Sequence, residues 1–482
     1  FFHMLRYHGI YMTERAGFVS TAHTEKDLDK AIEVFRKAIQ EMFDRQFFQP
    51  WEGEDQNEII YPYKEPVRIK AEILEDGIKK IPLTEGQEEI WIGNQFSREA
   101  SAAYTLATEI RLDGDFDLEK MKSAIQKLVD RHEALRTVFG RKEAYQLIYP
   151  SRTVEIPFVD LSGMSPEERE AELKVLHEYE AEELMDLHEG PLCRFKVVKM
   201  ASKVHLVFIT VHHIISDGWS LGIISTDLGE LYAAEVGAPA KDMKPPKQLG
   251  AFALEEINNK KTEAYTAAEK YWLSQFKDNV PVLEFPTDRS RPPIKTFNSD
   301  LEKIVLTKDV YNQLIKTAAK QGTTFYVFVY AAFQAFIQRL SQQEDFVLGV
   351  VAAGQSIAGN QDLVGHSVSL LPVRMQVDGD TSFTNHLKQT RSVVLDAFEH
   401  QNYTLGALVK KLKLPRDLSR QPIISILFNM DNAFNNMNFG DLSVSTRAIP
   451  RHYETFDIFI NIKLLESGLA FEWIYNTDLF FK

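Results

Sequence analysis

The chain has 482 residues, of which 44% are hydrophobic and 26% are charged, and its formal net charge is −14. These values are typical of a globular protein with roughly two to four domains, and they argue against disorder and against general nucleic-acid binding. The single Cys193 excludes a disulfide framework and a zinc ribbon. No run of 18 apolar residues predicts a membrane span, and the start lacks a signal-peptide layout and an initiator Met. We therefore expect a cytoplasmic fragment of a larger protein.

The first 80 residues divide into two parts. A short strand is predicted over 17–21, followed by an amphipathic helix that Thr24 caps and that continues to Met42. Fifty residues are too few for a stable domain alone. Residues 51–80, rich in acidic residues and proline, are predicted to form an irregular linker.

From residue 81 the pattern becomes mixed α/β. Strands are predicted over 106–112, 204–211 and 345–351, and helices over 118–129, from Asp217 onward, and over 262–277, 308–321 and 324–340. Gly322 is expected to end the helix before it from the C′ position. Breaks near 237–246 indicate two α/β lobes, 81–250 and 251–482.

The sharpest local feature is the run from His212 to Trp219, where an apolar strand ends and a helix begins. Neighbouring strand residues point to opposite faces, so we expect one histidine to face a cavity and the other to pack inward. A neutral imidazole can take a proton from an attacking amine or hydroxyl. Gly218 would allow a tight bend or the close approach of a ligand. A structural His-His pair and a metal site are the competing interpretations, and the opposed faces argue against the metal.

The order of motifs resembles the condensation domain of nonribosomal peptide synthetases. His212, His213, Asp217 and Gly218 match that family's active-site motif, HHxxxDG. The other similar segments are 83–91, 131–139, 339–349, 365–374, 416–423 and 471–480. Ser369 stands where the family commonly has Asn, which puts a role for that amide in doubt, and the family's last helix is not evident.

The resemblance implies a fold and an activity. The fold would be α/β (α+β), with two chloramphenicol-acetyltransferase-like lobes in a V around a central tunnel. The activity would join an acyl thioester on an upstream carrier protein to the amine of an aminoacyl thioester on a downstream carrier. Both substrates would arrive on phosphopantetheine arms, with no cofactor and no metal held by this chain. An L-configured or achiral donor end is favoured.

The resemblance also assigns residues. His213 would face the tunnel, either as a base or by positioning the amine, while His212 packs inward. Asp217 would be structural and held by an arginine, for which Arg131, Arg136 and Arg374 are all candidates. A buried carboxylate without a cation would be costly. Gly218 would lie near the pantetheine or the oxyanion.

Residues 1–50 resemble a second family, the C-terminal end of a class III pyridoxal-phosphate aminotransferase. An aminotransferase followed by a condensation domain is similar to the layout of hybrid polyketide–peptide synthases of the microcystin type. Adjacent aminotransferase and adenylation domains would then be partners, and a β-amino polyketide donor is suggested. Neither nucleic acid nor a membrane is expected as a partner. An epimerisation-type relative and a catalytically silent platform for carrier proteins remain the alternatives.

Overall fold

The computed structural model describes residues 69–357, 359–415, 417–431, 437–465 and 467–482. The chain divides into two compact units, residues 1–67 and 68–482. The strand predicted over 17–21 and the helix predicted from Thr24 to Met42 lie outside the described residues.

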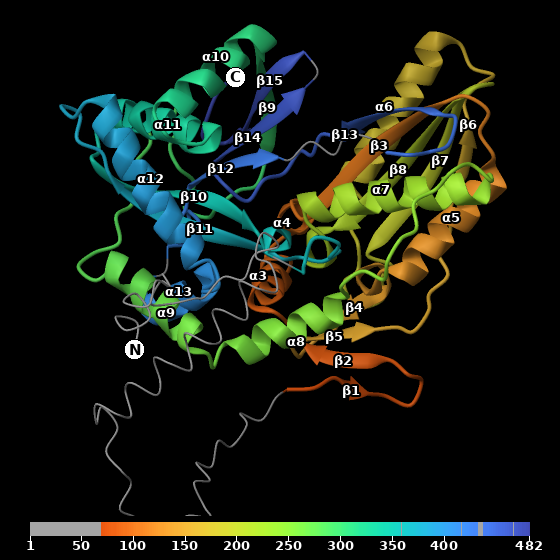
Figure 1. The fold of residues 1–482 in the computed structure, drawn as a ribbon, viewed down its shortest axis with the longest axis horizontal. Coiled ribbons are helices and arrows are strands. Elements are labelled where there is room, and N and C mark those ends of the chain that lie inside the picture. Colours follow the sequence, from red (N-terminus) through yellow and green to blue (C-terminus); the bar gives the residue numbers. More distant parts are fainter. Residues whose placement is uncertain (1–68, 358, 416, 432–436, 466) are drawn as a thin grey trace, which may run out of the picture. The chain divides into compact units, whose positions relative to one another are not determined.

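The first lobe is built on a five-stranded sheet in the order β13-β3-β8-β7-β6 (Figure 1). Its strands are β3 (Thr105–Asp113), β6 (Phe158–Asp160), β7 (Cys193–Ala201), β8 (Val204–His212) and β13 (Ser443–Ala448). Three helices pack on it: α5 (Leu118–Arg131), α6 (Pro166–Glu182) and α7 (Gly218–Glu235).

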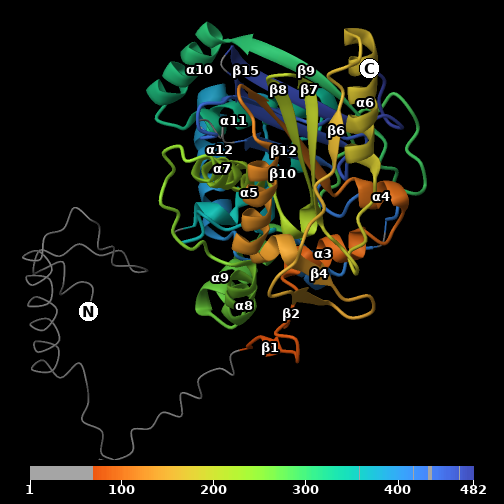
Figure 2. The same ribbon diagram turned by 90° about the vertical axis from the view of Figure 1, so that its right-hand side faces the viewer.

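The central strand β8 is buried on both faces. Val207 and Ile209 pack in one core with residues of α5 and α7, whereas Leu206 and Phe208 pack in another with residues of α6 (Figure 2). A strand covered on both faces reads as a continuous apolar run instead of an alternating one, which is why the sequence marks it so clearly.

A four-stranded sheet, β1-β2-β5-β4, lies beside this lobe. Its strands are β1 (Glu72–Ile73), β2 (Lys79–Pro82), β4 (Thr137–Phe139) and β5 (Tyr145–Ile148). The short helices α3 (Glu85–Gly93) and α4 (Arg98–Ala102) follow β2. The prediction that 51–80 is an irregular linker is therefore wrong for its last part, because β1 and the start of β2 pair in this sheet.

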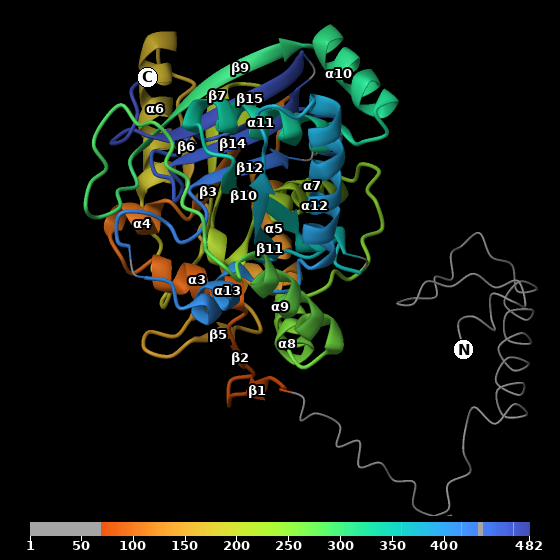
Figure 3. The same cartoon turned by 90° about the vertical axis from the view of Figure 1, so that its left-hand side faces the viewer.

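The second lobe carries a six-stranded sheet in the order β11-β10-β12-β14-β15-β9 (Figure 3). Its strands are β9 (Ser299–Thr307), β10 (Asp345–Ala353), β11 (Val368–Gln376), β12 (Ile426–Asp431), β14 (Ile458–Leu465) and β15 (Gly468–Asn476). Its helices are α9 (Glu263–Gln275), α10 (Lys308–Lys320), α11 (Phe325–Ser341), α12 (Phe383–Glu399) and α13 (Leu405–Leu412).

The two lobes exchange segments. Strand β13 follows the second lobe's β12 in sequence but pairs antiparallel with β3 of the first sheet, with Thr446 opposite Ile110. Helix α8 (Leu249–Asn259) begins at the predicted division yet places Ala253 against Ile81 and Ile148 of the small sheet. Residues 81–250 and 251–482 are thus interlocked, and this interlocking holds the site between them.

The positions of the long helices and strands agree with those predicted from the sequence. Helices α5, α7, α9, α10 and α11 and strands β3, β8 and β10 lie where periodicity predicts them. Gly322 has φ of +66° just after α10, and the next amide, Thr323 N–H, donates to Ala318 O at 3.1 Å. That is the expected C′ glycine. Over the described residues, no helix is long and apolar enough to span a membrane.

Candidate active site at the end of strand β8

The His-His run occupies the junction between β8 and α7. Strand β8 ends at His212, a short 3₁₀ turn covers His213–Ile215, and α7 begins at Gly218. Asp217 is the N-cap of α7, and its Oδ1 accepts the Ser220 N–H at 2.8 Å. Aspartate is among the best N-cap residues, so the motif's own acid starts the helix that follows it.

His212 packs inward, as predicted. Its Nδ1 accepts the Ile214 N–H at 3.2 Å, and its Nε2–H donates to Asn94 Oδ1, also at 3.2 Å. These two bonds fix one tautomer. Burial lowers the pKa of His212 to about 3, so the ring is neutral and ties the end of β8 to the end of α3.

His213 points toward the second lobe. Its backbone N–H donates to Tyr104 O at 2.7 Å, and its Nδ1 lies 3.2 Å from Nδ1 of His366. Burial lowers the pKa of His213; Asp217 opposes this effect and Arg451 adds to it. The imidazole is therefore neutral at pH 7, the state in which it can accept a proton.

Asp217 is fully buried and is held by neutral donors from both lobes. Besides Ser220, the amide of Gln355 donates to both carboxylate oxygens at 2.9 Å. The Ser367 backbone N–H donates to Oδ2 at 3.1 Å. The prediction that an arginine holds Asp217 is wrong, because amide and hydroxyl donors already satisfy the carboxylate in this buried position.

The three candidate arginines have other partners. Arg131 Nε binds Asp227 Oδ2 at 2.7 Å, and Arg136 donates to the Tyr149 and Asp130 carbonyls at 2.8 and 3.3 Å. Arg374 forms a two-bond pair with Asp345 at 2.6 and 2.9 Å. Each of these contacts lies within the arginine's own lobe.

Gly218 is exposed at the first position of α7. Its φ is not in the left-handed region, so a tight bend does not explain this glycine. A Cβ built there would meet only Asp431 Oδ1, at 4.0 Å. The space beside Gly218 fits the other expectation, the close approach of a ligand.

Three residues of the site were missed by sequence reasoning: His366, Gln355 and Ser367. His366 and Ser367 belong to the similar segment 365–374, but no signal in the sequence indicated their contacts with His213 and Asp217. Gln355 follows β10 with no local signal. Together with His213 and Asp217 they form what we call the His213 cluster.

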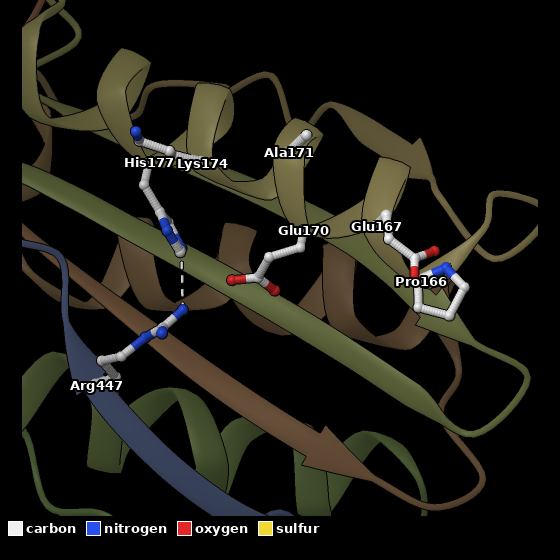
Figure 4. A pocket seen from close by; sticks show the side chains of 7 residues that line it. All are labelled: Pro166, Glu167, Glu170, Ala171, Lys174, His177 and Arg447. Carbon is white, nitrogen blue, oxygen red and sulfur yellow. Dashed lines mark hydrogen bonds between the residues drawn. The ribbon is translucent and has the colours of Figure 1, made fainter.

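A pronounced surface groove lies elsewhere. It has a volume of about 580 Å³ and runs between α6 and β13, where His177 and Arg447 lie 3.4 Å apart (Figure 4). Both side chains bind buried Glu109, at 2.7 and 3.0 Å. None of the groove's lining residues belongs to the His213 cluster. Within the described ranges, no group of three or more His, Cys, Asp or Glu side chains could hold a metal ion.

The fold and the site define a two-lobed, acyltransferase-like protein with a neutral histidine between its lobes. A family model described as "Condensation domain" matches residues 78–482. The chain therefore belongs to the condensation-domain family. Condensation domains of nonribosomal peptide synthetases form amide bonds, and this chain is an enzyme of that acyltransferase-like class.

Curated relatives agree. The chain is 32% identical to Tyrocidine synthase 3 of Brevibacillus parabrevis over 403 residues, which is 83% of this chain and 6% of that protein. It is 31% identical to Surfactin synthase subunit 2 of Bacillus subtilis (strain 168) over 401 residues, which is 83% of this chain and 11% of that protein. The chain thus spans only a small fraction of the length of these two relatives.

Solved structures share the fold. The condensation domain from Monacolin K polyketide synthase MokA has a TM-score of 0.74 at 17% identity, covering 83% of this chain and 93% of that one. The first condensation domain of the calcium-dependent antibiotic synthetase has a TM-score of 0.71 at 20% identity, covering 83% and 92%. The predicted fold class of two chloramphenicol-acetyltransferase-like lobes is confirmed.

Proposed function

We propose that this domain transfers an acyl group from a thioester on an upstream carrier protein to the amine of an aminoacyl thioester on a downstream carrier. The amine nitrogen bonds to the acyl carbon, the upstream thiol leaves with a proton, and the amide remains on the downstream carrier. A thioester is already activated, so the catalyst must chiefly position the amine and stabilise the tetrahedral intermediate.

The observation that carries this proposal is the state of His213. The ring is neutral, its Nδ1 faces His366, and it lies where the two lobes meet. Nε2 is therefore the nitrogen left to act on a substrate. In this role His213 takes a proton from the attacking amine or holds that amine in place.

The other motif residues have supporting roles in this proposal. Asp217 pins the start of α7 to Gln355 and Ser367 of the second lobe, and so fixes the turn that carries His213. His212 holds the end of β8 through Asn94. Gly218 leaves room for the pantetheine or the oxyanion. Arg131, Arg136 and Arg374 stabilise their own lobes.

Both substrates would reach His213 through a tunnel between the lobes, each on the phosphopantetheine arm of its carrier protein. This chain would then need no cofactor of its own. The partners would be the upstream and downstream carriers.

Residues 1–50 bear on the kind of synthase that contains this domain. Their resemblance to the end of a class III aminotransferase supports a hybrid polyketide–peptide synthase in which an amination step precedes this domain. The donor would then be a β-amino polyketide acyl group, and an adenylation domain would load the acceptor carrier. The small share of each curated relative that this chain covers fits one domain of a long synthetase.

The test is a transfer between two carriers. A β-aminoacyl group is loaded on an upstream carrier and an amino acid on a downstream one, and intact-protein mass spectrometry follows both. We expect the summed mass on the downstream carrier. Carrier binding without transfer for any donor would favour the silent platform. Inversion of a carrier-bound peptidyl centre without a new amide would favour the epimerisation-type relative.

A further inference from the structure

A second histidine, outside the HHxxxDG motif, faces His213. His366 is buried and lies 153 positions later in the chain, just before β11. The two Nδ1 atoms are 3.2 Å apart, and the rings meet edge to face with their centroids 5.1 Å apart. This distance and this orientation make a hydrogen bond between the two imidazoles.

The chain on either side of His366 is fixed to the start of α7. The Gly365 N–H donates to Ser220 Oγ at 3.1 Å, and the Gly365 carbonyl accepts the Ser220 hydroxyl at 3.0 Å. On the other side, the Ser367 N–H donates to Asp217 at 3.1 Å. The groups that anchor the HHxxxDG turn, Asp217 and Ser220, therefore also anchor the chain on both sides of His366.

Helix α3 leaves room for the ring of His366. A Cβ on Gly86 of α3 would lie 2.9 Å from His366 Cδ2 and 3.0 Å from its Nε2. Those distances are shorter than side-chain packing allows, so any larger residue at position 86 would displace the imidazole. Gly86 and His366 are thus matched across the two lobes.

A hydrogen bond between two Nδ1 atoms needs one N–H and one lone pair. Burial holds the pKa of His366 well below its usual value and also lowers that of His213, so both rings are neutral. The position of one proton therefore sets the tautomer of both rings. If His213 donates from Nδ1, its Nε2 keeps a lone pair; if His366 donates, His213 carries a hydrogen on Nε2.

We propose that His366 is a positioning residue that accepts the Nδ1–H of His213 and so leaves Nε2 of His213 free to act on the amine. This inference rests on the proposed function, since only that tautomer lets Nε2 accept a proton.

The direct test is the tautomer itself, measured by nitrogen NMR of the histidine rings in the whole chain, with His213→Ala and His366→Asn used for assignment. We expect a protonated Nδ1 and an unprotonated Nε2 in His213. The reverse tautomer, in which His366 donates and His213 carries its hydrogen on Nε2, is the result that would overturn the proposal.

Two variants test the consequence. His366→Leu removes the acceptor, so the His213 tautomers should redistribute and kcat for carrier-to-carrier transfer should fall roughly 10- to 100-fold, with KM little changed. His366→Asn offers an amide oxygen to Nδ1–H and should restore the tautomer and recover most of that loss. A kcat in His366→Leu equal to that of the wild type would contradict the assignment.

The two proposals can fail separately. A wild-type protein with the expected tautomer but no transfer would overturn the proposed function alone. Transfer by a protein whose His213 carries hydrogen on Nε2 would overturn the role of His366 alone. If His366→Leu does not fold, as judged by urea unfolding, the wild-type tautomer still decides.

Discussion

Asp217 and Gln355 bind each other across the two lobes: the Gln355 amide nitrogen lies 2.9 Å from both oxygens of the Asp217 carboxylate. Both side chains are fully buried. The Asp217 carboxylate is therefore stabilised by the Gln355 amide dipole and by hydrogen bonds from Ser220 and Ser367, without a cation. This arrangement makes Asp217 a connection between the lobes.

Asp217→Asn should destabilise the fold. The asparagine side chain keeps one acceptor oxygen and replaces the other with an NH₂ group, which would face the N–H groups that now donate to the carboxylate. Some of these buried donors would then have no acceptor. We expect a loss of about 2–3 kcal/mol in the free energy of unfolding, measured with urea. Asp115→Asn is the matched control, because Asp115 is 88% exposed and pairs with Lys203 at the surface. Equal stability of the two variants would mean that Asp217 does not hold the lobes together.

His212→Ala should also act on stability. It removes the acceptor of the Ile214 N–H and the donor to Asn94, both at the end of β8. We expect a loss of about 1–3 kcal/mol in the free energy of unfolding. Transfer at a temperature where the variant is folded should be reduced less than in His213→Ala. A stable variant with no transfer would place His212 in the chemistry instead.

Much of this architecture could be predicted from the sequence, for a physical reason. A strand such as β8, covered on both faces, and helices with a clear apolar stripe, such as α5, leave local patterns. The division between lobes was less visible, because β13 pairs with a strand more than 300 positions away. Only three-dimensional contact reveals such an exchange.

The site was predictable in its residue types but not in its partners. The HHxxxDG run points to His213 as the candidate catalytic residue. The prediction that His212 packs inward agrees with the structure. The negative charge of Asp217 led to the prediction of an arginine partner. The structure has Gln355 there instead, because several neutral donors together can satisfy a buried carboxylate. His366 lay within a recognised segment, but no pattern in the sequence brings it to His213.

The pH dependence of transfer should separate base catalysis from positioning. The pKa of His213 is below its usual value, so the ring stays neutral above about pH 6.5 and is protonated only below that value. Asp217, Arg451, His212 and His366 are the groups that face it. The amine of the acceptor substrate titrates in the same range, and its effect is the same for both proteins. We therefore compare the ratio of the single-turnover rate of the wild type to that of His213→Ala between about pH 5 and pH 8. Base catalysis predicts a ratio that falls only toward the acidic end; a flat ratio would contradict it.

Two carboxyl groups at the contacts of α3, Glu89 on α3 itself and Glu256 on α8, give stability its own pH dependence. Glu89 accepts the Gly406 N–H at 2.7 Å, and burial raises its pKa from 4.5 to about 7. Burial likewise raises the pKa of Glu256 to about 7. Between pH 4.5 and 7 the folded state keeps a proton that the unfolded state releases, so stability falls as the pH rises through that window.

Glu89→Gln keeps the acceptor for Gly406 and removes this titration. We expect the variant to be more stable than the wild type by about 1–3 kcal/mol above pH 7, with the difference vanishing near pH 4.5. Glu88→Gln on the same helix is the control, since Glu88 pairs with Lys410 at the surface. Parallel stability curves for wild type and Glu89→Gln would show that Glu89 has no raised pKa.

The most direct test of the account is a single-turnover transfer measurement with wild type, His213→Ala and His188→Ala on preloaded carriers. His188 binds the Phe139 carbonyl and is not a member of the His213 cluster, so it controls for the loss of a histidine. We predict that amide formation falls by at least about 100-fold in His213→Ala alone, with urea unfolding unchanged. Amide formation by His213→Ala at the wild-type rate would contradict the central claim that His213 drives the transfer.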